Sequence, residues 1–548
     1  MRSVVALLAL AGVILAQNPQ PPQGSISGVV RDESTGKPMA GVDIEASRPA
    51  ATAVTTKTDA EGRYTLSGLD PGSYRVIART RPGGPVGIPM FASRPVTLQG
   101  GQDVTGIDIL LRPSGEISGK VVDGNGEPLA GIRVFLVAKE YSSGALRLVL
   151  GGGGTSDDQG NYTMVGRIEG GRAYLLLAQK RQMQLPAVSD APDDPRLRRP
   201  ALLPTYHPDA GTPEQAQALV LRVGERRENV DIRMRKTPSY CIESVLTGPT
   251  GPDGLTFRIG LQQPTNGASG SGAFYAGDPG GPLGPRGEVR ICDLPPGEYD
   301  LTVEERPAAG TDARSPELFE RARITVTDRD VVGFRLAARP GMEVPGEVAW
   351  HGPAPDKPVE ATLSLELRSI TRTIRHSAKS TIPGQFSLPG MPLDEYSVSI
   401  RGLPDGIYLK DLTYAGHSIL GKSLRAGSAM GEAALRILVA RDGSFVNARV
   451  TDRDGNPVGN CYVHLLPAGV GSEAELAALM QSEQTDQYGA WKSGALAPGK
   501  YYVLATYGAV DKSPEDIGKL WRARLRAQEV TLGPSATAQV KLEPQALE

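Results

Sequence analysis

The chain has 548 residues, which at about 100–200 residues per domain is enough for several domains and too long for one compact core. Its 59 Lys and Arg residues nearly balance its 61 Asp and Glu residues, which argues against a nucleic-acid partner recognised by bulk charge. Its 67 glycines and 45 prolines favour many short strands joined by turns and lie below the range typical of disorder.

The first predicted element is a secretory signal peptide at residues 1–16. One basic residue, Arg2, precedes an apolar run from Val4 to Ala16, which is short for a bilayer span, and a Pro-rich linker follows at residues 17–23. An uncleaved anchor helix is the alternative. No later apolar stretch reaches membrane length, so we expect a secreted, periplasmic or envelope protein without a transmembrane segment in its mature chain.

A spaced motif then recurs along the chain. It reads "TDAEGRYTLSGLDPGSY" at residues 58–74 and keeps every interval in "TDQYGAWKSGALAPGKY" at 485–501. Looser copies lie at 156–174, 287–299 and 384–396. Its aromatic and turn positions are Gly62, Tyr64, Pro71, Gly72, Tyr74, Gly160, Tyr162, Tyr174, Gly287, Pro296, Gly297, Tyr299, Phe386, Tyr396, Gly489, Trp491, Pro498, Gly499 and Tyr501.

The spacing of this motif predicts a core element at the end of a β-sandwich. In the first copy Tyr64 and Leu66 fall on one face of a strand because side chains alternate. Pro71 and Gly72 turn the chain, and Tyr74 re-enters the core, where its hydroxyl can bond to nearby backbone as in a tyrosine corner. We therefore expect these residues to specify the fold and to take no part in chemistry.

Strand–turn–strand patterns with Asp-Gly and Asn-Gly turns frame each copy and divide the chain into five predicted β-sandwiches: 24–112, 113–236, 237–339, 340–441 and 442–548. Helical patterns are few and short, at 212–221, 472–481 and 513–528. In the last of these, Ser513 and Pro514 resemble a helix start. The predicted fold class is therefore all-β, a tandem array of about five Ig-like or transthyretin-like sandwiches with a few short helices.

The motif "TDAEGRYTLSGLDPGSYRV", preceded by "ISGVVRDESTGKPMAGVDI", closely resembles the carboxypeptidase regulatory-like family. The second and fifth units carry most of this pattern, and the third and fourth carry only the aromatic and Tyr positions. The resemblance implies a transthyretin-like sandwich, grouped with carbohydrate-binding-like folds and common in tandem in secreted and envelope proteins of bacteria. It also implies a regulatory-type module that itself lacks catalytic residues.

The sequence predicts no catalytic, cofactor-binding or metal-ligating residue. None of the five histidines (His207, His351, His376, His417 and His464) has a glutamate three residues on, as one part of a zinc peptidase site would need. There is no Gly-x-Ser-x-Gly nucleophile turn. The stretch "LGGGGTSDD" at 150–158 lacks the Lys and Ser or Thr of a phosphate loop, and we interpret it as a flexible hairpin loop.

Two further sets of residues are candidates. Cys241 and Cys292 lie in the same predicted sandwich and could form a disulfide in an oxidising compartment, while two buried thiols are the alternative. Cys461 is then left over as a buried free thiol. Trp350 and Trp521 are the aromatics that the motif does not use and that could contact a ligand, although docking of Trp521 onto a sandwich face is the favoured interpretation.

Together these features predict a non-enzymatic secreted or envelope protein that acts as a binding or scaffolding (adhesion-type) array. Its partner would be a protein or glycan of the cell envelope, and the long connection at 181–211 is the best place for a partner contact. The alternatives are a carbohydrate-binding protein, an accessory protein to an outer-membrane receptor or a peptidase, and a hydrolase with an unrecognised site.

Overall fold

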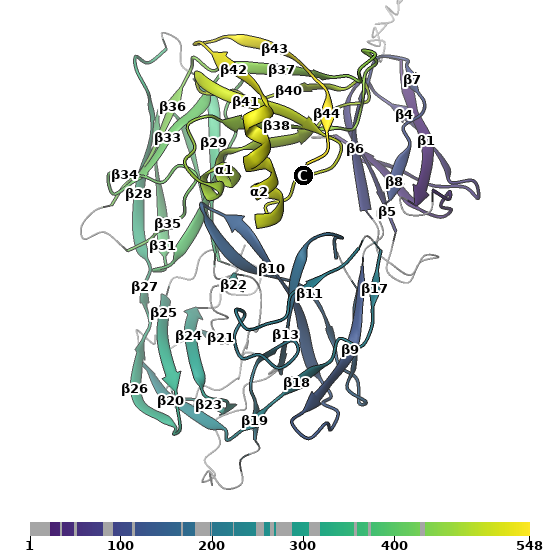
Figure 1. The fold of residues 1–548 in the computed structure, drawn as a ribbon. Helices are drawn as coiled ribbons and strands as arrows, with labels where there is room; N and C mark the ends of the chain where they lie inside the picture. Colours follow the sequence, from purple (N-terminus) through teal and green to yellow (C-terminus); the bar gives the residue numbers. More distant parts are fainter. Residues whose placement is uncertain are drawn as a thin grey trace, which may run out of the picture. The chain divides into compact units, whose positions relative to one another are not determined.

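The computed structural model describes residues 22–32, 36–48, 52–80, 91–111, 115–165, 168–180, 198, 200–222, 224–247, 257–262, 268–269, 288–305, 318–355, 359–370, 374–427 and 433–547. The predicted signal peptide and most of the Pro-rich linker lie outside these residues. The chain is nearly all β-structure, and its sheets follow one another in pairs that we number first to fifth sandwich in chain order (Figure 1). The first sandwich is one compact unit, and the later sandwiches form a second.

The first sandwich pairs two four-stranded sheets. One has the order β4-β1-β7, with β8 also on β1: β1 (Gly24–Asp32), β4 (Arg63–Leu69), β7 (Asp103–Val104) and β8 (Ile109–Leu111). The other has the order β3-β2-β5-β6: β2 (Asp43–Ser47), β3 (Val54–Lys57), β5 (Gly72–Arg79) and β6 (Phe91–Leu98). Inward side chains such as Ile26, Leu66 and Val76 are almost fully buried.

The second sandwich has a larger sheet in the order β15-β13-β10-β11-β22, with β16 on β13. Its strands are β10 (Ile132–Ser142), β11 (Ala145–Thr155), β13 (Ala173–Lys180), β15 (Thr205–Tyr206), β16 (Leu219–Val220) and β22 (Ala268–Ser269). The opposite sheet has the order β12-β9-β17 with β18 on β9: β9 (Glu116–Asp123), β12 (Asn161–Val165), β17 (Arg226–Arg227) and β18 (Ile232–Met234). A separate pair joins β14 (Ala201–Leu202) to β19 (Lys236–Thr237).

The third sandwich pairs a sheet of order β23-β20-β26 with one of order β21-β24-β25-β27. Its strands are β20 (Tyr240–Thr247), β21 (Phe257–Gln262), β23 (Glu288–Leu294), β24 (Gly297–Glu305), β25 (Leu318–Val326), β26 (Val331–Ala337) and β27 (Arg339–Pro340). The fourth pairs β31-β28-β36-β33-β34 with β30-β29-β32-β35. Its strands are β28 (Met342–Trp350), β29 (Val359–Ser369), β30 (Arg375–Ile382), β31 (Gly384–Met391), β32 (Glu395–Arg401), β33 (Tyr408–Tyr414), β34 (His417–Ser418), β35 (Leu424–Arg425) and β36 (Leu435–Ala440).

The fifth sandwich pairs β40-β37-β43 with β39-β38-β41-β42, and β44 joins β41. Its strands are β37 (Phe445–Val450), β38 (Tyr462–Pro467), β39 (Gln481–Gln484), β40 (Ala490–Lys492), β41 (Gly499–Thr506), β42 (Gln528–Leu532), β43 (Thr537–Leu542) and β44 (Pro544–Gln545). Two helices cover it: α1 (Glu473–Leu479) and α2 (Pro514–Ala523), the latter followed by the 3₁₀ turn η2 (Arg524–Arg526). Their buried residues Leu476, Ile517 and Leu520 pack with Leu466 and Leu504 of the sheet.

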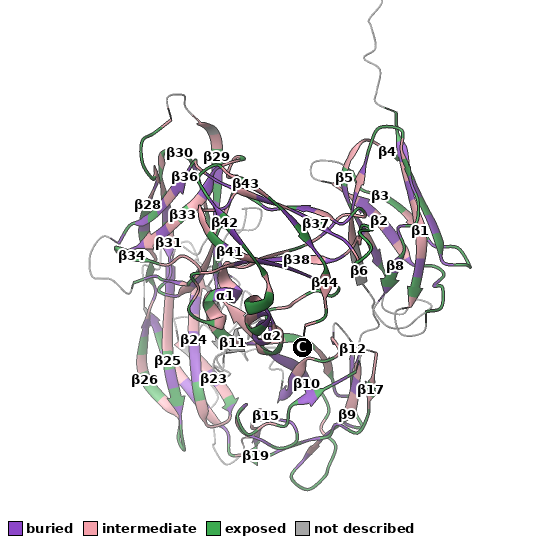
Figure 2. Ribbon diagram, turned by 45° about the horizontal axis from the view of Figure 1, so that its top comes forward, coloured by how far each residue is buried: buried purple, intermediate pink, exposed green. Residues whose placement is uncertain are grey.

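Separate hydrophobic cores lie between the sheets of the second, third, fourth and fifth sandwiches. Buried residues alternate with less buried ones along many of the strands (Figure 2), as expected where every second side chain faces the core. The all-β tandem fold predicted from the sequence is therefore confirmed. The five boundaries given above stay a prediction, since contacts divide the chain into two compact units only. No helix in the described residues is long and apolar enough to cross a membrane.

The helix predictions hold in two cases out of three. Ser513 caps α2 by accepting a hydrogen bond from the Asp516 N–H at 3.2 Å, as its Ser-Pro start indicates. The prediction of a helix at 212–221 is wrong, because this segment forms turns and then enters β16. Val220 of β16 pairs with Ala173 of β13, so tertiary pairing overrides the local helical pattern.

Candidate functional site

The repeat tyrosines close the ends of the sandwiches. Four of them donate a hydroxyl hydrogen bond to the carbonyl four residues earlier: Tyr74 to Asp70 at 2.9 Å, Tyr299 to Pro295 at 2.6 Å, Tyr396 to Pro392 at 2.9 Å and Tyr501 to Ala497 at 2.8 Å. The copy at 156–174 has two extra residues before its last tyrosine and differs, because there the Tyr174 hydroxyl accepts from the Glu169 N–H at 3.0 Å. Each ring is buried. These tyrosines act as corners between strands.

The first aromatic residue of the motif lies directly opposite a small residue on the neighbouring strand. Tyr64 pairs with Gly28, and Tyr162 pairs with Gly119. Both tyrosine hydroxyls are buried and donate to a backbone carbonyl near the last strand, Tyr64 to Ile107 at 2.7 Å and Tyr162 to Val230 at 2.5 Å. Burial raises the pKa of both hydroxyls.

The same pairing recurs without a tyrosine in the last two sandwiches. Phe386 pairs with Gly346 and Trp491 pairs with Ala448. A small residue thus stands opposite the aromatic in four sandwiches. The sequence reasoning above missed this relation, although "ISG" in the first two units and "VPG" in the fourth could have shown it.

The glycine before each aromatic serves a turn. Gly62, Gly160 and Gly489 have φ of 74°, 77° and 69°, a left-handed conformation that glycine adopts without strain. An aspartate three residues earlier stabilises each turn: the Asp59 carboxylate, for example, accepts the Arg63 N–H at 2.7 Å. Asp157 and Asp486 do the same in the other two copies, and the sequence reasoning missed them too.

The remaining motif positions lie at the corners. Pro71 and Gly72, Pro296 and Gly297, and Pro498 and Gly499 stand where β5, β24 and β41 begin. Gly287 lies outside the described residues. The motif side chains are therefore spent on core packing, turns and backbone hydrogen bonds.

The cysteine and tryptophan candidates also lie in packed surroundings. Cys241 and Cys292 are joined by a disulfide in the structure, between the neighbouring strands β20 and β23. Cys461 is a buried free thiol whose pKa burial raises to about 11. Trp350 packs against the core of the fourth sandwich. Trp521 packs against the core under α2, with the Arg524 guanidinium 3.4 Å from its ring centroid. This placement favours packing over ligand contact for both tryptophans.

Three of the histidines have well-defined surroundings. His376 and His464 are buried in different sandwiches, and burial lowers the pKa of each to about 4. His207 Nδ1 lies 2.8 Å from the backbone oxygen of Asp231. Within the described residues, no group of three or more His, Cys, Asp or Glu side chains is placed to hold a metal ion.

A cavity of about 410 Å³ beside the larger sheet of the second sandwich is a candidate site. Its apolar wall comes from β10, β12, β13 and the segment before β13: Leu136, Ala138, Met164, Ile168 and Tyr174, all members of the sandwich core. Val149 and Gly151–Gly153 of β11 also line it. Five charged residues complete it: Glu140, Glu169, Arg172, Asp511 and Lys512.

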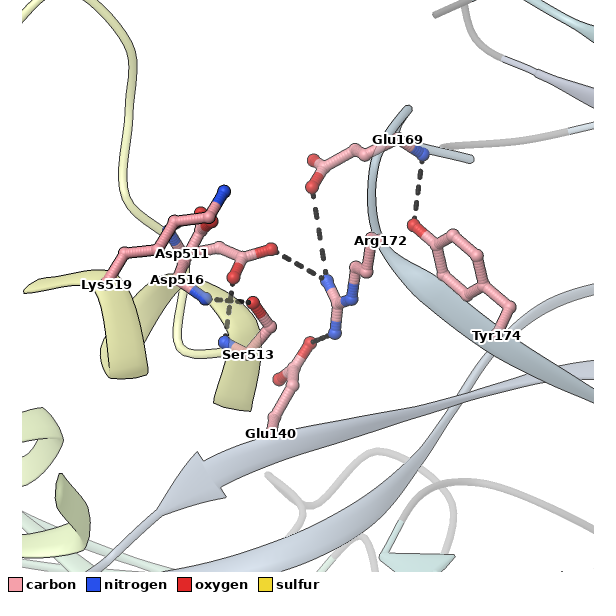
Figure 3. A network of polar contacts seen from close by, with 8 residues as sticks. All are labelled: Glu140, Glu169, Arg172, Tyr174, Asp511, Ser513, Asp516 and Lys519. Atoms are coloured by element: carbon pink, nitrogen blue, oxygen red, sulfur yellow. Dashed lines mark hydrogen bonds and ion pairs between the residues drawn. The ribbon is translucent and has the colours of Figure 1, made fainter. Parts of the chain in front are cut away.

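Arg172 is the centre of the charged group (Figure 3). Its guanidinium is mostly buried and pairs with Glu140, with Asp511 at 3.3 Å and with Glu169 at 4.0 Å. Burial opposes its charge, but the hydrogen bond to Glu140 and the charge of Asp511 keep the pKa of Arg172 above its ordinary value. Asp511 itself is held by the Ser513 N–H at 2.7 Å.

The charged group joins two sandwiches, because Asp511 and Lys512 belong to the fifth. The Tyr141 N–H of β10 donates to the Lys512 carbonyl at 2.8 Å. The Tyr141 hydroxyl donates to Glu473 of α1 at 2.9 Å. The cavity is therefore built from segments more than 300 residues apart, which no sequence motif could reveal.

The glycine run beside the cavity is a strand, so its interpretation as a flexible hairpin loop is wrong. β11 continues through the glycines and pairs with β10, where Phe135 opposes Gly153 and Val137 opposes Leu150. Two residues, Gly151 and Gly152, therefore stand opposite Leu136, which is a β-bulge. Pairing with β10 supplies the order that glycine alone would not.

Comparison with known proteins gives a family match for one domain and several solved structures of low similarity. Residues 25–112 match the model of the carboxypeptidase regulatory-like domain. The resemblance seen in the motif is thus confirmed for the first sandwich. A search of curated proteins finds no relative of the chain.

Several solved structures match the chain at low identity and with low TM-scores. The TIE protein of Bacillus anthracis is 11% identical, with 78% of this chain and 73% of that chain covered and a TM-score of 0.15. The major pilin subunit of Bacillus cereus is 13% identical, with coverages of 58% and 100% and a TM-score of 0.16. The minor pilin of Streptococcus agalactiae is 13% identical, with coverages of 42% and 98% and a TM-score of 0.18.

Proposed function

We propose that the chain is a non-enzymatic binding or scaffolding protein of the cell envelope or the cell exterior. The observation that carries this proposal is the set of ion pairs that fix the later sandwiches to one another. Arg147 of the second pairs with Glu395 of the fourth, and both side chains are mostly buried. Arg172 pairs with Asp511 of the fifth in the same way.

A third tie is bidentate. Arg198 pairs with Asp330 of the third sandwich through hydrogen bonds of 2.6 and 2.8 Å, and the same carboxylate accepts the Cys241 N–H at 2.8 Å. Bidentate Arg–carboxylate pairs add geometric specificity as well as energy. Ion pairs of this kind restrict the movement of one sandwich against another. This suits a scaffold whose binding surface is formed by loops of more than one sandwich.

The motif residues also support the proposal, because they have structural roles. Their hydroxyls, rings and glycines are committed to corners and cores, and the carboxypeptidase regulatory-like match covers the first sandwich alone. A protein built in this way offers loops on a fixed framework, and we propose the connection at 181–211, which includes β14 and β15, for partner contact. Export through the signal peptide at 1–16 is part of the proposal.

The test is fractionation and cross-linking in the native host. We expect the mature protein outside the cytoplasm, with its N-terminus near Gln17, and cross-linked to a defined envelope protein or glycan. Replacing residues 181–197 by a Gly-Ser linker should reduce the cross-link, whereas Gly211→Ala at an open surface position should not. A cytoplasmic location, or turnover of a peptide, ester or glycoside substrate that Glu169→Gln abolishes in the pure protein, would contradict the proposal.

A further inference from the structure

Packing explains two of the four consecutive glycines of β11 (Gly151–Gly154) but not the other two. A Cβ on Gly153 would lie 2.3 Å from the Val134 carbonyl oxygen, and one on Gly154 would lie 2.4 Å from that of Thr163. These two positions have no room for a side chain. Gly151 and Gly152 differ, because a Cβ on Gly151 would have its nearest contact at an ordinary 3.5 Å and one on Gly152 would have none within 4 Å.

Neither Gly151 nor Gly152 has a left-handed conformation that would require glycine. Glycine inside a strand weakens the strand and often marks a bulge or a place where a ligand or another backbone approaches closely. Both residues line the cavity. They also form the β-bulge opposite Leu136, and the room that their missing side chains leave is part of the cavity.

The apolar side chains that line the cavity indicate that it would hold an apolar group. Its core residues are buried by the fold, and the cavity exposes part of them to an incoming molecule. A volume of 410 Å³ lies within the range of small-molecule sites, which combine an apolar body with a few polar groups. An aromatic or aliphatic group would bury its surface there.

The charges at the cavity give the sign of the ligand. Three carboxylates, from Glu140, Glu169 and Asp511, face two cations, from Arg172 and Lys512. Arg172 is already paired with all three carboxylates, so its positive charge is neutralised within the protein and does not attract an anionic ligand. One positive charge on the ligand would balance the group.

We propose that this cavity binds a small amphiphile with an apolar body and a positively charged amine, with the body against β10 and β11 and the amine among the carboxylates. The site is made by the second and fifth sandwiches together, so its occupation would also stabilise their contact. The proposal goes beyond the scaffolding function and does not depend on it. Partner contacts through loops could exist without it.

The test uses the full mature chain and three probes of equal body, phenethylamine, 2-phenylethanol and 3-phenylpropionate, in saturation-transfer NMR and isothermal titration. We expect the amine to bind at least about tenfold tighter than the alcohol, and the acid to bind most weakly, because the local charge favours a cation. The preference should shrink at high salt. Equal binding of the three probes, tighter binding of the acid, or no binding at all would overturn the proposal.

Two variants locate the site. Gly151→Val should fill the cavity and weaken amine binding more than tenfold without lowering the melting temperature, while Gly211→Val at an open turn should leave binding unchanged. Glu169→Gln should reduce the preference for the amine over the alcohol several-fold and leave the affinity for the alcohol unchanged. Unchanged probe binding in both cavity variants would show that the amine binds elsewhere. Loss of the envelope cross-link, by contrast, concerns the scaffold function alone.

Discussion

The glycine opposite the first motif aromatic gives the sharpest test of how the first sandwich is closed. Gly28 lies in β1 beneath the segment that connects β7 and β8. A Cβ at this position would lie 2.0 Å from the carbonyl oxygen of Ile107 and 2.4 Å from its carbonyl carbon. The obstacle is the backbone of Ile107 and Asp108, so Gly28→Ala must push this segment, just before β8, away from β1.

The cost follows from what this displacement breaks. The buried Ile107 carbonyl accepts the Tyr64 hydroxyl at 2.7 Å, and the Ile107 N–H donates to the Ser27 carbonyl at 3.0 Å. Leaving a buried acceptor unpaired costs about 1–3 kcal/mol, and overpacking typically adds about 1–3 kcal/mol. We expect the variant to lose about 2–6 kcal/mol locally, or about 1.5–4.5 decades of exchange protection.

Hydrogen exchange read by mass spectrometry on the full chain measures this directly. Protection should fall in β1 and β4 and stay constant in β36 and β37, which belong to other sandwiches. Tyr64→Phe removes the hydrogen bond and leaves the space, so it should reproduce only about 1–2 kcal/mol of the loss. Gly100→Ala, whose Cβ would have ordinary contacts of 3.6–3.9 Å, is the matched control. Wild-type protection of β1 in Gly28→Ala would refute the reasoning.

Three further predictions concern single groups. Tyr396→Phe should cost the fourth sandwich about 1 kcal/mol, measured by chemical denaturation, because the Pro392 carbonyl loses its bond; no loss would count against the corner role. Burial holds the pKa of His464 at about 4, below its unfolded value of about 6.5. The free energy of unfolding should therefore fall by up to about 3 kcal/mol as the pH drops from about 6.5 to about 4, and His464→Gln should flatten this dependence of stability on pH. Intact-mass analysis should find Cys241 and Cys292 oxidised, and reduction should cost the third sandwich about 4 kcal/mol, since 51 residues separate them; two free thiols in the purified mature chain would contradict the disulfide.

The sequence could predict those parts of the fold that depend on local spacing. Alternation placed Tyr64 and Leu66 on one face, the Pro-Gly step placed the corner, and the Ser-Pro start placed α2. These features involve neighbours within a few residues, for which backbone geometry leaves few choices. The long repeat with kept intervals then made the array of sandwiches the natural interpretation.

The candidate site could not be predicted because its parts meet only through tertiary structure. Arg172 and Asp511 are 339 residues apart, and although Arg172 lies within the motif copy at 156–174, it is not one of the recurring motif positions. The glycines at 151–154 indicate a loop by composition, whereas their conformation is set by pairing with β10. Strand pairing of this kind depends on context more than on the residue itself.

The pair formed by a small residue and an aromatic explains why one motif can serve sandwiches that differ in detail. In the first and second sandwiches, a Cβ on Gly28 or Gly119 would meet the carbonyl of Ile107 or Val230, and the tyrosine hydroxyl holds that same carbonyl. In the fourth, a Cβ on Gly346 would instead meet the ring of Phe386 at 2.1 Å.

These are two solutions to one packing problem, the gap above a strand position that has little or no side chain. A hydroxyl is needed only in the first solution, because only there does a backbone carbonyl fill the gap. Phenylalanine can therefore replace tyrosine in the fourth sandwich without loss of the fold. The pair, and not the aromatic alone, is the unit by which further sandwiches of this kind should be recognised in a sequence.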